Sequence, residues 1–243
     1  MVKLMSKRVV SILRMGSVEP EIEVNHGDFV DWIRAELPAE QQLNASVIDP
    51  ASGNLPEPES IEALIITGSS SMVTEPSKSD LQAFRWLERV LETDTPILGI
   101  CYGHQMLGHV LGGRVGALPG GPEIGLAEIA ISAERDPLFG SCSDRQEVAV
   151  IHWETVLELP PGSTVLGYGA RDPHQIVRFR PNVWGVQFHP EFGPGVMTYY
   201  ARTSVDELKA LGLDAREVAA RTQAWSGDRT GVIQRFGEFV SGL

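Results

Sequence analysis

Apolar residues divide the chain into two parts with different patterns. Up to about residue 113, short apolar runs alternate with amphipathic stretches, and this alternation predicts a parallel sheet covered by helices. The apolar runs that predict strands are 8–13, 45–48, 61–67 and 96–100. We therefore expect an α/β domain in which each early strand leads into a helix.

Helices are predicted between these strands from apolar positions three and four residues apart. Phe29, Ile33 and Leu37 indicate a helix over 28–37. Ser79 and Gln82 form a candidate capping box for a second helix. The buried stripe of that second helix is expected to consist of Leu81, Phe84, Leu87 and Leu91.

Beyond residue 113 glycine and proline become frequent, and the apolar runs become short. The runs that predict strands here are 124–131, 147–151, 164–168, 175–179 and 183–188. This pattern favours a partly antiparallel region joined to the parallel sheet.

From about residue 194 the pattern predicts helices. Asp214 with Glu217 is a candidate N-terminal cap. A last apolar stripe consists of Val232, Phe236, Phe239 and Val240. We expect one α/β domain over residues 1–193 and a helical extension over 194–243 packed on the same domain.

Cys101 is the residue with the strongest chemical signal. It lies in the run P-I-L-G-I-C-Y-G-H-Q, residues 96–105, where a predicted strand meets a predicted helix and a glycine stands two positions away on each side. Such a G-x-C-x-G turn is typical of a nucleophile elbow with sulfur in place of the hydroxyl. The turn places the side chain at the carboxyl end of a strand and at a helix N-terminus, which favours the thiolate.

A cysteine nucleophile needs a base, and the base needs a group that orients it. The best candidate is the run V-W-G-V-Q-F-H-P-E, residues 183–191. A predicted strand ends there and leads to His189, Pro190 restricts the backbone, and Glu191 can bind one imidazole nitrogen so that the other faces the thiol.

Two other histidines compete with this assignment. His104 is close to Cys101 in the sequence, but no carboxylate stands beside it. His152, followed by Trp153 and Glu154, either lines the site or packs in the core. The structural alternative is that the cysteine is a small buried apolar residue, as expected of Cys142, and that His-Pro-Glu is only a turn.

Composition limits the classes of partner. The 243 residues are 42% hydrophobic, enough for a sizeable core, and the formal net charge of −12 argues against nucleic acid and anionic membranes as partners. No apolar run approaches the roughly 20 residues of a membrane helix. A disulfide between Cys101 and Cys142 would remove the nucleophile, so we expect a reducing, cytoplasmic location. No zinc-like ligand spacing is present, and we expect no metal and no organic cofactor.

Taken together, the elbow and the strand-His-Pro-Glu unit resemble a class I (triad-type) glutamine amidotransferase domain. The resemblance covers residues 61–192 and is nearest in motif to GMP synthetase-type glutaminase domains. Two weaker matches support it, namely the run I-T-G-S-S-S-M-V over 66–73, at the place of the family's oxyanion loop, and Glu123-Ile124-Gly125. The family's loop commonly has two glycines and a proline where this chain has Gly68, Ser69 and Ser70.

The resemblance implies a flavodoxin-like α/β fold, with an open mixed sheet and helices on both faces. It also implies a catalytic triad of Cys101, His189 and Glu191. The oxyanion hole would consist of Gly68, Ser69 and the backbone of Tyr102. Gln105, His152 and Trp153 would bind the substrate, although relatives linked to a synthetase carry a small residue and an aspartate in place of Trp153 and Glu154.

The predicted reaction is hydrolysis of the γ-amide of glutamine through a γ-glutamyl thioester, releasing glutamate and ammonia. The ammonia could feed a separate synthetase subunit, because neither a phosphate-binding loop nor a synthetase domain is recognisable in the chain. An alternative is a stand-alone hydrolase of γ-glutamyl peptides or conjugates. An alternative of another class is a catalytically silent or regulatory binding module, or a relative of the Parkinson-linked stress proteins, which also carry an elbow cysteine.

Overall fold

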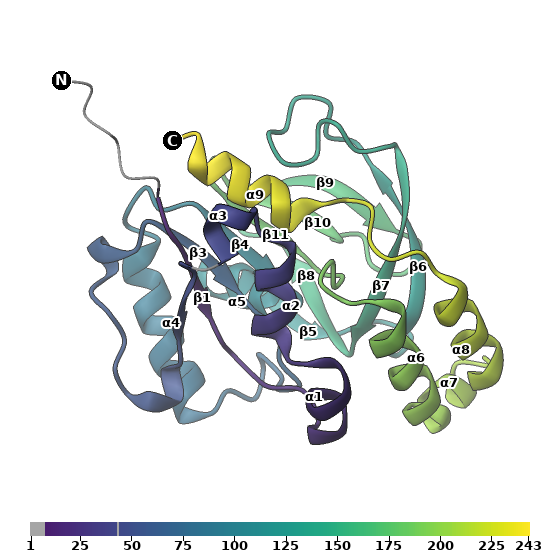
Figure 1. Ribbon diagram of the computed structural model, residues 1–243. Helices are drawn as coiled ribbons and strands as arrows, with labels where there is room; N and C mark the ends of the chain where they lie inside the picture. Colours follow the sequence, from purple (N-terminus) through teal and green to yellow (C-terminus); the bar gives the residue numbers. More distant parts are fainter. Residues whose placement is uncertain (1–7, 43) are drawn as a thin grey trace.

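The computed structural model describes residues 8–42 and 44–243 (Figure 1). Within these residues, nine strands form one sheet in the order β2-β1-β3-β4-β11-β10-β9-β6-β7. The strands of this sheet are β1 (Val10–Leu13), β2 (Ser46–Ile48), β3 (Ala63–Ile66), β4 (Ile97–Ile100), β6 (Glu123–Ile131), β7 (Arg145–His152), β9 (Thr164–Gly169), β10 (Ile176–Arg180) and β11 (Val183–Val186). A smaller sheet pairs β5 (Arg114–Ala117) with β8 (Glu154–Glu158) in antiparallel fashion.

The sheet has a parallel half and an antiparallel half, as expected from the change in pattern near residue 113. The pairs β2–β1, β1–β3, β3–β4 and β4–β11 are parallel. The pairs β11–β10, β10–β9, β9–β6 and β6–β7 are antiparallel. Because β1, β3, β4 and β11 are consecutive in the sheet, the segments that follow their carboxyl ends come together at one edge.

Helices cover both faces of the parallel half. They are α1 (Pro20–His26), α2 (Phe29–Glu36), α3 (Ala39–Gln42), α4 (Lys78–Val90) and α5 (Tyr102–Val110), with short 3-10 turns η1 (Pro50–Ser52) and η2 (Pro58–Ser60). One core cluster joins β1, β3 and β4 to α2, and a second joins the other face of these strands to α4 and α5. The expected α/β architecture with helices on both faces is therefore confirmed.

The start of α4 corrects one expectation. The capping box is formed by Ser77 and Asp80, not by Ser79 and Gln82, since the Ser77 hydroxyl accepts from the Asp80 N–H and the Asp80 carboxylate accepts from the Ser77 N–H. Leu81 is 42% exposed and lies outside the buried stripe, which is centred on Ala83, Leu87 and Val90. Ser77 and Ser79 each have a suitable residue three positions later, so the sequence pattern does not distinguish between them.

The last part of the chain forms α6 (Pro194–Thr203), α7 (Val205–Ala210), α8 (Ala215–Ala224) and α9 (Val232–Ser241). Figure 1 shows α6, α7 and α8 beside the β6–β7 end of the sheet and α9 close to α3. The predicted cap of α8 is present, because the Asp214 carboxylate accepts from the Arg216 N–H. Helix α9 buries Val232, Phe236 and Val240 in the same core cluster as α2, and each such side chain contributes about 2 kcal/mol by burial.

No helix in residues 8–42 and 44–243 is long and apolar enough to cross a membrane.

Candidate active site

Cys101 occupies a strained turn between β4 and α5. Its φ is +50°, and among the described residues it is the only non-glycine residue with a positive φ. The turn depends on the flanking glycines. A Cβ on Gly99 would lie 2.5 Å from the carbonyl of Gly103, and a Cβ on Gly103 would lie 2.5 Å from the carbonyl oxygen of Ile66. The elbow predicted from the sequence is thus present, and its strain is of the kind that accumulates at functional sites.

The thiol of Cys101 is buried but contacts a cavity. The residue is 4% exposed and lines the cavity described below. The side-chain amide of Gln187 donates to Cys101 Sγ at 3.6 Å, and the carbonyl oxygen of Ile151 is 3.9 Å from the same sulfur. An N–H donor of this kind stabilises negative charge on the sulfur.

The ring of His189 is fixed on three sides. Its Nδ1 lies 2.8 Å from Glu191 Oε1, and its backbone N–H donates to the Ala149 carbonyl at 2.9 Å. The Phe192 ring stacks on the imidazole at a centroid distance of 4.0 Å. On another side, a Cβ added to Gly68 would be 2.8 Å from His189 Cε1. The ring therefore has little room to rotate, and Nε2 is left for chemistry.

Charge around His189 favours the imidazolium. Burial alone would lower its pKa, but the negative charges of Glu191 and Cys101, together with hydrogen bonds to both side chains, raise the pKa of His189 to about 10. His189 therefore interacts with Glu191 on one side and with Cys101 on the other. A cysteine hydrolase uses the same order of carboxylate, imidazole and sulfur.

The segment after β3 is the one that we expect to form part of the oxyanion hole. The Thr67 hydroxyl accepts from the Met15 N–H at 3.0 Å, which joins this loop to the one after β1. The Ser69 hydroxyl accepts from the Ser71 N–H at 3.1 Å, and Ser69, Ser70 and Ser71 line the cavity. Tyr102 is the first residue of α5, and its side chain is buried away from the cavity, so that only its backbone is available for a role there.

Glu154 holds the far end of this loop. Its Oε2 accepts from the Val73 N–H at 2.8 Å and from the Thr74 N–H at 3.4 Å, while its Oε1 accepts from the Thr74 hydroxyl. The carboxylate is 81 residues from Val73 in the sequence. A side chain on β8 therefore fixes the position of the loop that follows β3.

Three residues expected to bind substrate line the cavity in different ways. The amide nitrogen of Gln105 already donates to the Glu154 carbonyl at 2.7 Å and to Gln187 Oε1 at 3.1 Å. The His152 ring points into the protein, where Nδ1 is 2.9 Å from the same carbonyl and Nε2 is 3.0 Å from Glu123 Oε2. Trp153 is 37% exposed at the cavity.

His104, the competing base, lies elsewhere. It is fully buried against Phe179, neither ring nitrogen has a hydrogen-bond partner, and it is not among the residues that line the cavity. Burial lowers the pKa of His104 to about 3. The structure therefore does not bring His104 to the nucleophile.

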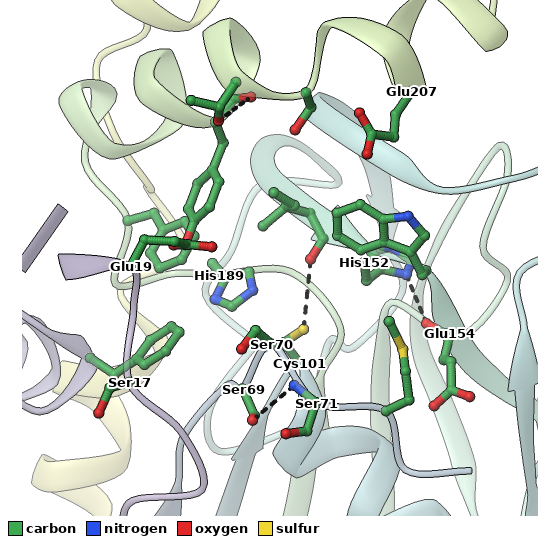
Figure 2. A pocket seen from close by; sticks show the side chains of 18 of the residues that line it. Ser17, Glu19, Ser69, Ser70, Ser71, Cys101, His152, Glu154, His189 and Glu207 are labelled. Carbon is green, nitrogen blue, oxygen red and sulfur yellow. Dashed lines mark hydrogen bonds between the residues drawn. The ribbon is translucent and has the colours of Figure 1, made fainter. Parts of the chain in front are cut away.

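The cavity that holds Cys101 and His189 has a volume of about 430 Å³. One wall is made by the loops after β1, β3, β4 and β11, and the opposite wall is made by α6 and α7 (Figure 2). The residues contributed by the helical wall are Tyr199, Tyr200, Thr203, Ser204 and Glu207. Within the described residues, no group of three His, Cys, Asp or Glu side chains is arranged to hold a metal ion.

Several site residues carry no signal in the sequence. Gln187 lies within the strand-His-Pro-Glu run, but nothing in that pattern distinguishes it, and Glu154 stands out in the sequence only as a neighbour of His152. Glu19 and the helical wall join the site through packing of segments far apart in the chain.

The fold and the site together define an α/β enzyme class with a cysteine at a strand-to-helix elbow. A family model described as glutamine amidotransferase class-I matches residues 39–207. The chain belongs to this family.

Curated relatives include two proteins named GMP synthase [glutamine-hydrolyzing]. The one from Bacillus licheniformis is 38% identical over 131 residues, which is 54% of this chain and 24% of that protein. The one from Pyrobaculum aerophilum is 33% identical over 175 residues, 72% of this chain and 33% of that protein. The chain thus spans only about a quarter to a third of the length of these relatives.

Solved structures confirm the flavodoxin-like fold that the resemblance implies. A glutamine amidotransferase from Thermotoga maritima superposes with a TM-score of 0.70 at 24% identity and covers 98% of this chain and 95% of its own. One from Methylobacillus flagellatus gives a TM-score of 0.66 at 17% identity, covering 96% of this chain and 95% of its own.

Proposed function

We propose that this protein hydrolyses the γ-amide of glutamine through a triad of Cys101, His189 and Glu191. The observation that carries the proposal is the His189 ring, which Glu191 holds through Nδ1 while Cys101 raises the pKa of the same imidazole. This arrangement supports a thiolate and an imidazolium side by side, which is the reactive state of a cysteine hydrolase.

In the first half-reaction the Cys101 thiolate attacks the γ-carbonyl carbon. The developing oxyanion would accept from backbone N–H groups of Tyr102 and of the loop at Gly68 and Ser69, and one such donor is typically worth about 3 kcal/mol. His189 then donates its Nε2 proton to the amide nitrogen, the C–N bond breaks, and ammonia leaves a γ-glutamyl thioester on the sulfur.

In the second half-reaction neutral His189 takes a proton from water, and the resulting hydroxide attacks the thioester carbon. The C–S bond breaks, glutamate is released and the thiolate is restored. Gln105, His152 and Trp153 would hold the glutamyl group. The sulfur and the hydrogen-bond donors supply this chemistry, so the scheme uses no metal or organic cofactor.

The names of the relatives support a proposal about the fate of the ammonia. Because the curated relatives are GMP synthases that hydrolyse glutamine, we propose a separate synthetase subunit as a possible acceptor. Both cysteines are free thiols, which fits a reducing cytoplasmic location.

The function is tested by glutamate release from glutamine with the purified protein. Cys101→Ala should abolish turnover, while circular dichroism and melting temperature stay close to those of the parent. Cys142→Ser is the matched control and should retain activity, since Cys142 lies outside the cavity. Full activity of the Cys101→Ala variant would refute the proposed nucleophile.

A second candidate is the hydrolysis of γ-glutamyl peptides or conjugates. The helical wall favours it, because α6 and α7 extend the cavity beyond the catalytic side chains. Ammonia alone as leaving group would leave that part of the cavity unused.

A further inference from the structure

The cavity continues past the proposed catalytic residues to side chains of α6 and α7. Its volume of about 430 Å³ lies within the range of roughly 300–1,000 Å³ found for pockets that take drug-sized ligands. The cavity is a ligand site on independent grounds, because Cys101 and His189 open into it. The side chains that line the part of the cavity beside α6 and α7 determine which substituent on the leaving nitrogen fits there.

The direction of the leaving group follows from the proposed mechanism. His189 must protonate the departing nitrogen, so any substituent on that nitrogen starts beside the imidazole. From there aromatic rings lead away in sequence, since Phe192 stacks on His189 and Tyr200 stacks on Phe192 at 5.8 Å. The Tyr200 hydroxyl donates to Glu19 Oε2 at 3.1 Å, so the series of rings ends at a carboxylate.

Apart from the His189 imidazolium, the charged side chains that line the cavity from the rest of the described chain are acidic. Within the described part of the chain, the lining includes three glutamates and neither lysine nor arginine. The Glu154 carboxylate is occupied by the backbone of Val73 and Thr74. Of the other two, Glu19 accepts a single hydrogen bond from the Tyr200 hydroxyl through Oε2, and Figure 2 shows Glu207 at the end of the cavity opposite Ser69–Ser71, with its carboxylate directed inward.

The aromatic side chains of the lining, like the carboxylates, favour a positively charged group. Trp153, Tyr199 and Tyr200 contribute rings to the cavity. An ammonium group within about 6 Å of such a ring is attracted to its face. Rings and carboxylates together therefore favour a cation and disfavour an anion in this part of the site.

We propose that the enzyme prefers γ-glutamyl amides whose nitrogen carries a cationic substituent, as in the γ-glutamyl conjugate of a diamine. This inference rests on the proposed cysteine hydrolysis and adds its substrate class. Glu19 and Glu207 are the specificity-determining residues, and the products are glutamate and the free diamine. The bonds formed and broken are those of the glutamine reaction, with the amine leaving in place of ammonia.

The test compares three γ-glutamyl amides of similar length, made from 1,4-diaminobutane, butylamine and 4-aminobutyrate, with glutamine as a fourth substrate. Glutamate release gives kcat/KM for each. We expect the cationic amide to exceed the neutral amide by about tenfold, and the anionic amide to be the poorest substrate. Glu19→Gln and Glu207→Gln should each lower the ratio of cationic to neutral kcat/KM about threefold.

Asp206→Asn is the matched control, because Asp206 precedes Glu207 on α7 but does not line the cavity. It should leave the ratio unchanged. Equal kcat/KM for the three amides, a ratio that survives both glutamate substitutions, or hydrolysis of glutamine alone would overturn the inference and leave the proposed function standing. Absence of hydrolysis for all four substrates would instead overturn the proposed function, and the inference with it.

Discussion

The two walls of the cavity are built in different ways. On the sheet side, Cys101, His189 and Glu191 are each at least nine-tenths buried, and each is fixed by turns or hydrogen bonds. On the helical side, Tyr199, Tyr200 and Glu207 are half-buried.

We infer from this difference that the two walls have different roles. In the proposed mechanism the sheet wall sets the chemistry, because a strained elbow and a confined ring hold the reacting atoms in one geometry. The helical wall contacts His189 only indirectly, through the stacking of Tyr200 on Phe192, so we expect changes there to disturb that geometry less. Substitutions on the sheet wall should therefore change turnover strongly, and those on the helical wall should change selectivity.

Among substitutions that leave Cys101 in place, the largest effect is expected for Glu191→Gln. An amide at this position removes the negative charge beside His189 Nδ1, so the imidazolium is less stable and the ring is less well oriented. We expect kcat for glutamine to fall about 100-fold, measured by glutamate release. A loss of less than threefold would mean that the buried carboxylate has no part in the chemistry.

The pH dependence of the acylation rate also tests the role of Glu191. Because Glu191 and Cys101 raise the pKa of His189 to about 10, the imidazolium that protonates the leaving group persists until pH approaches 10. In the proposed mechanism the acylation rate should therefore stay level near neutral pH and fall as the pH rises through about 10. In Glu191→Gln the raising charge is lost, and the basic limb should move to lower pH by at least about one unit. If the basic limb stayed at the same pH in Glu191→Gln, the limb would report the titration of a group other than His189.

A smaller effect is expected for Glu154→Ala. Loss of the carboxylate frees the Val73 and Thr74 N–H groups and loosens the loop after β3, which we propose to form part of the oxyanion hole. We therefore expect kcat to fall about tenfold, with a lesser change in KM. Glu154→Gln keeps an acceptor oxygen and should restore part of the rate. Glu158→Ala is the control on the same strand, where Glu158 pairs with Arg114 at the surface. Equal losses for Ala and Gln would show that the loop does not depend on this acceptor.

The smallest effect is expected for Tyr200→Phe on the helical wall. The substitution removes the hydrogen bond to Glu19 but keeps the ring that stacks on Phe192. We expect kcat/KM for glutamine to change by about threefold or less. A loss as large as that of Glu191→Gln would remove the distinction between the two walls.

The parallel half of the fold could be predicted from the sequence because its strands are fully buried runs next to amphipathic helices. Strand boundaries shifted by one or two residues; β11, for example, ends at Val186 and not at Phe188. Helix α1 was missed because only Ile22 is buried, so no apolar stripe is visible. Strand β5 was missed because it is short, partly exposed and contains Gly116.

The site could be predicted from the sequence where its residues lie close together along the chain. Gly99, Cys101 and Gly103 form a turn within five residues, and His189 and Glu191 are two residues apart. Contacts between distant segments were not predictable, such as Glu154 with Val73 or Glu19 with Tyr200, since these depend on how loops pack across the cavity. The burial of His104 likewise depends on Phe179 and Gly185, far along the chain.

Covalent labelling with a glutamine-like chloroketone, followed by mass spectrometry of peptides, shows whether Cys101 is a reactive thiolate in a site for glutamine. We expect a single adduct on Cys101, slowed by added glutamine, with Cys142 unlabelled. Labelling of Cys142 in preference to Cys101, or labelling of Cys101 at a rate that glutamine does not alter, would contradict this expectation.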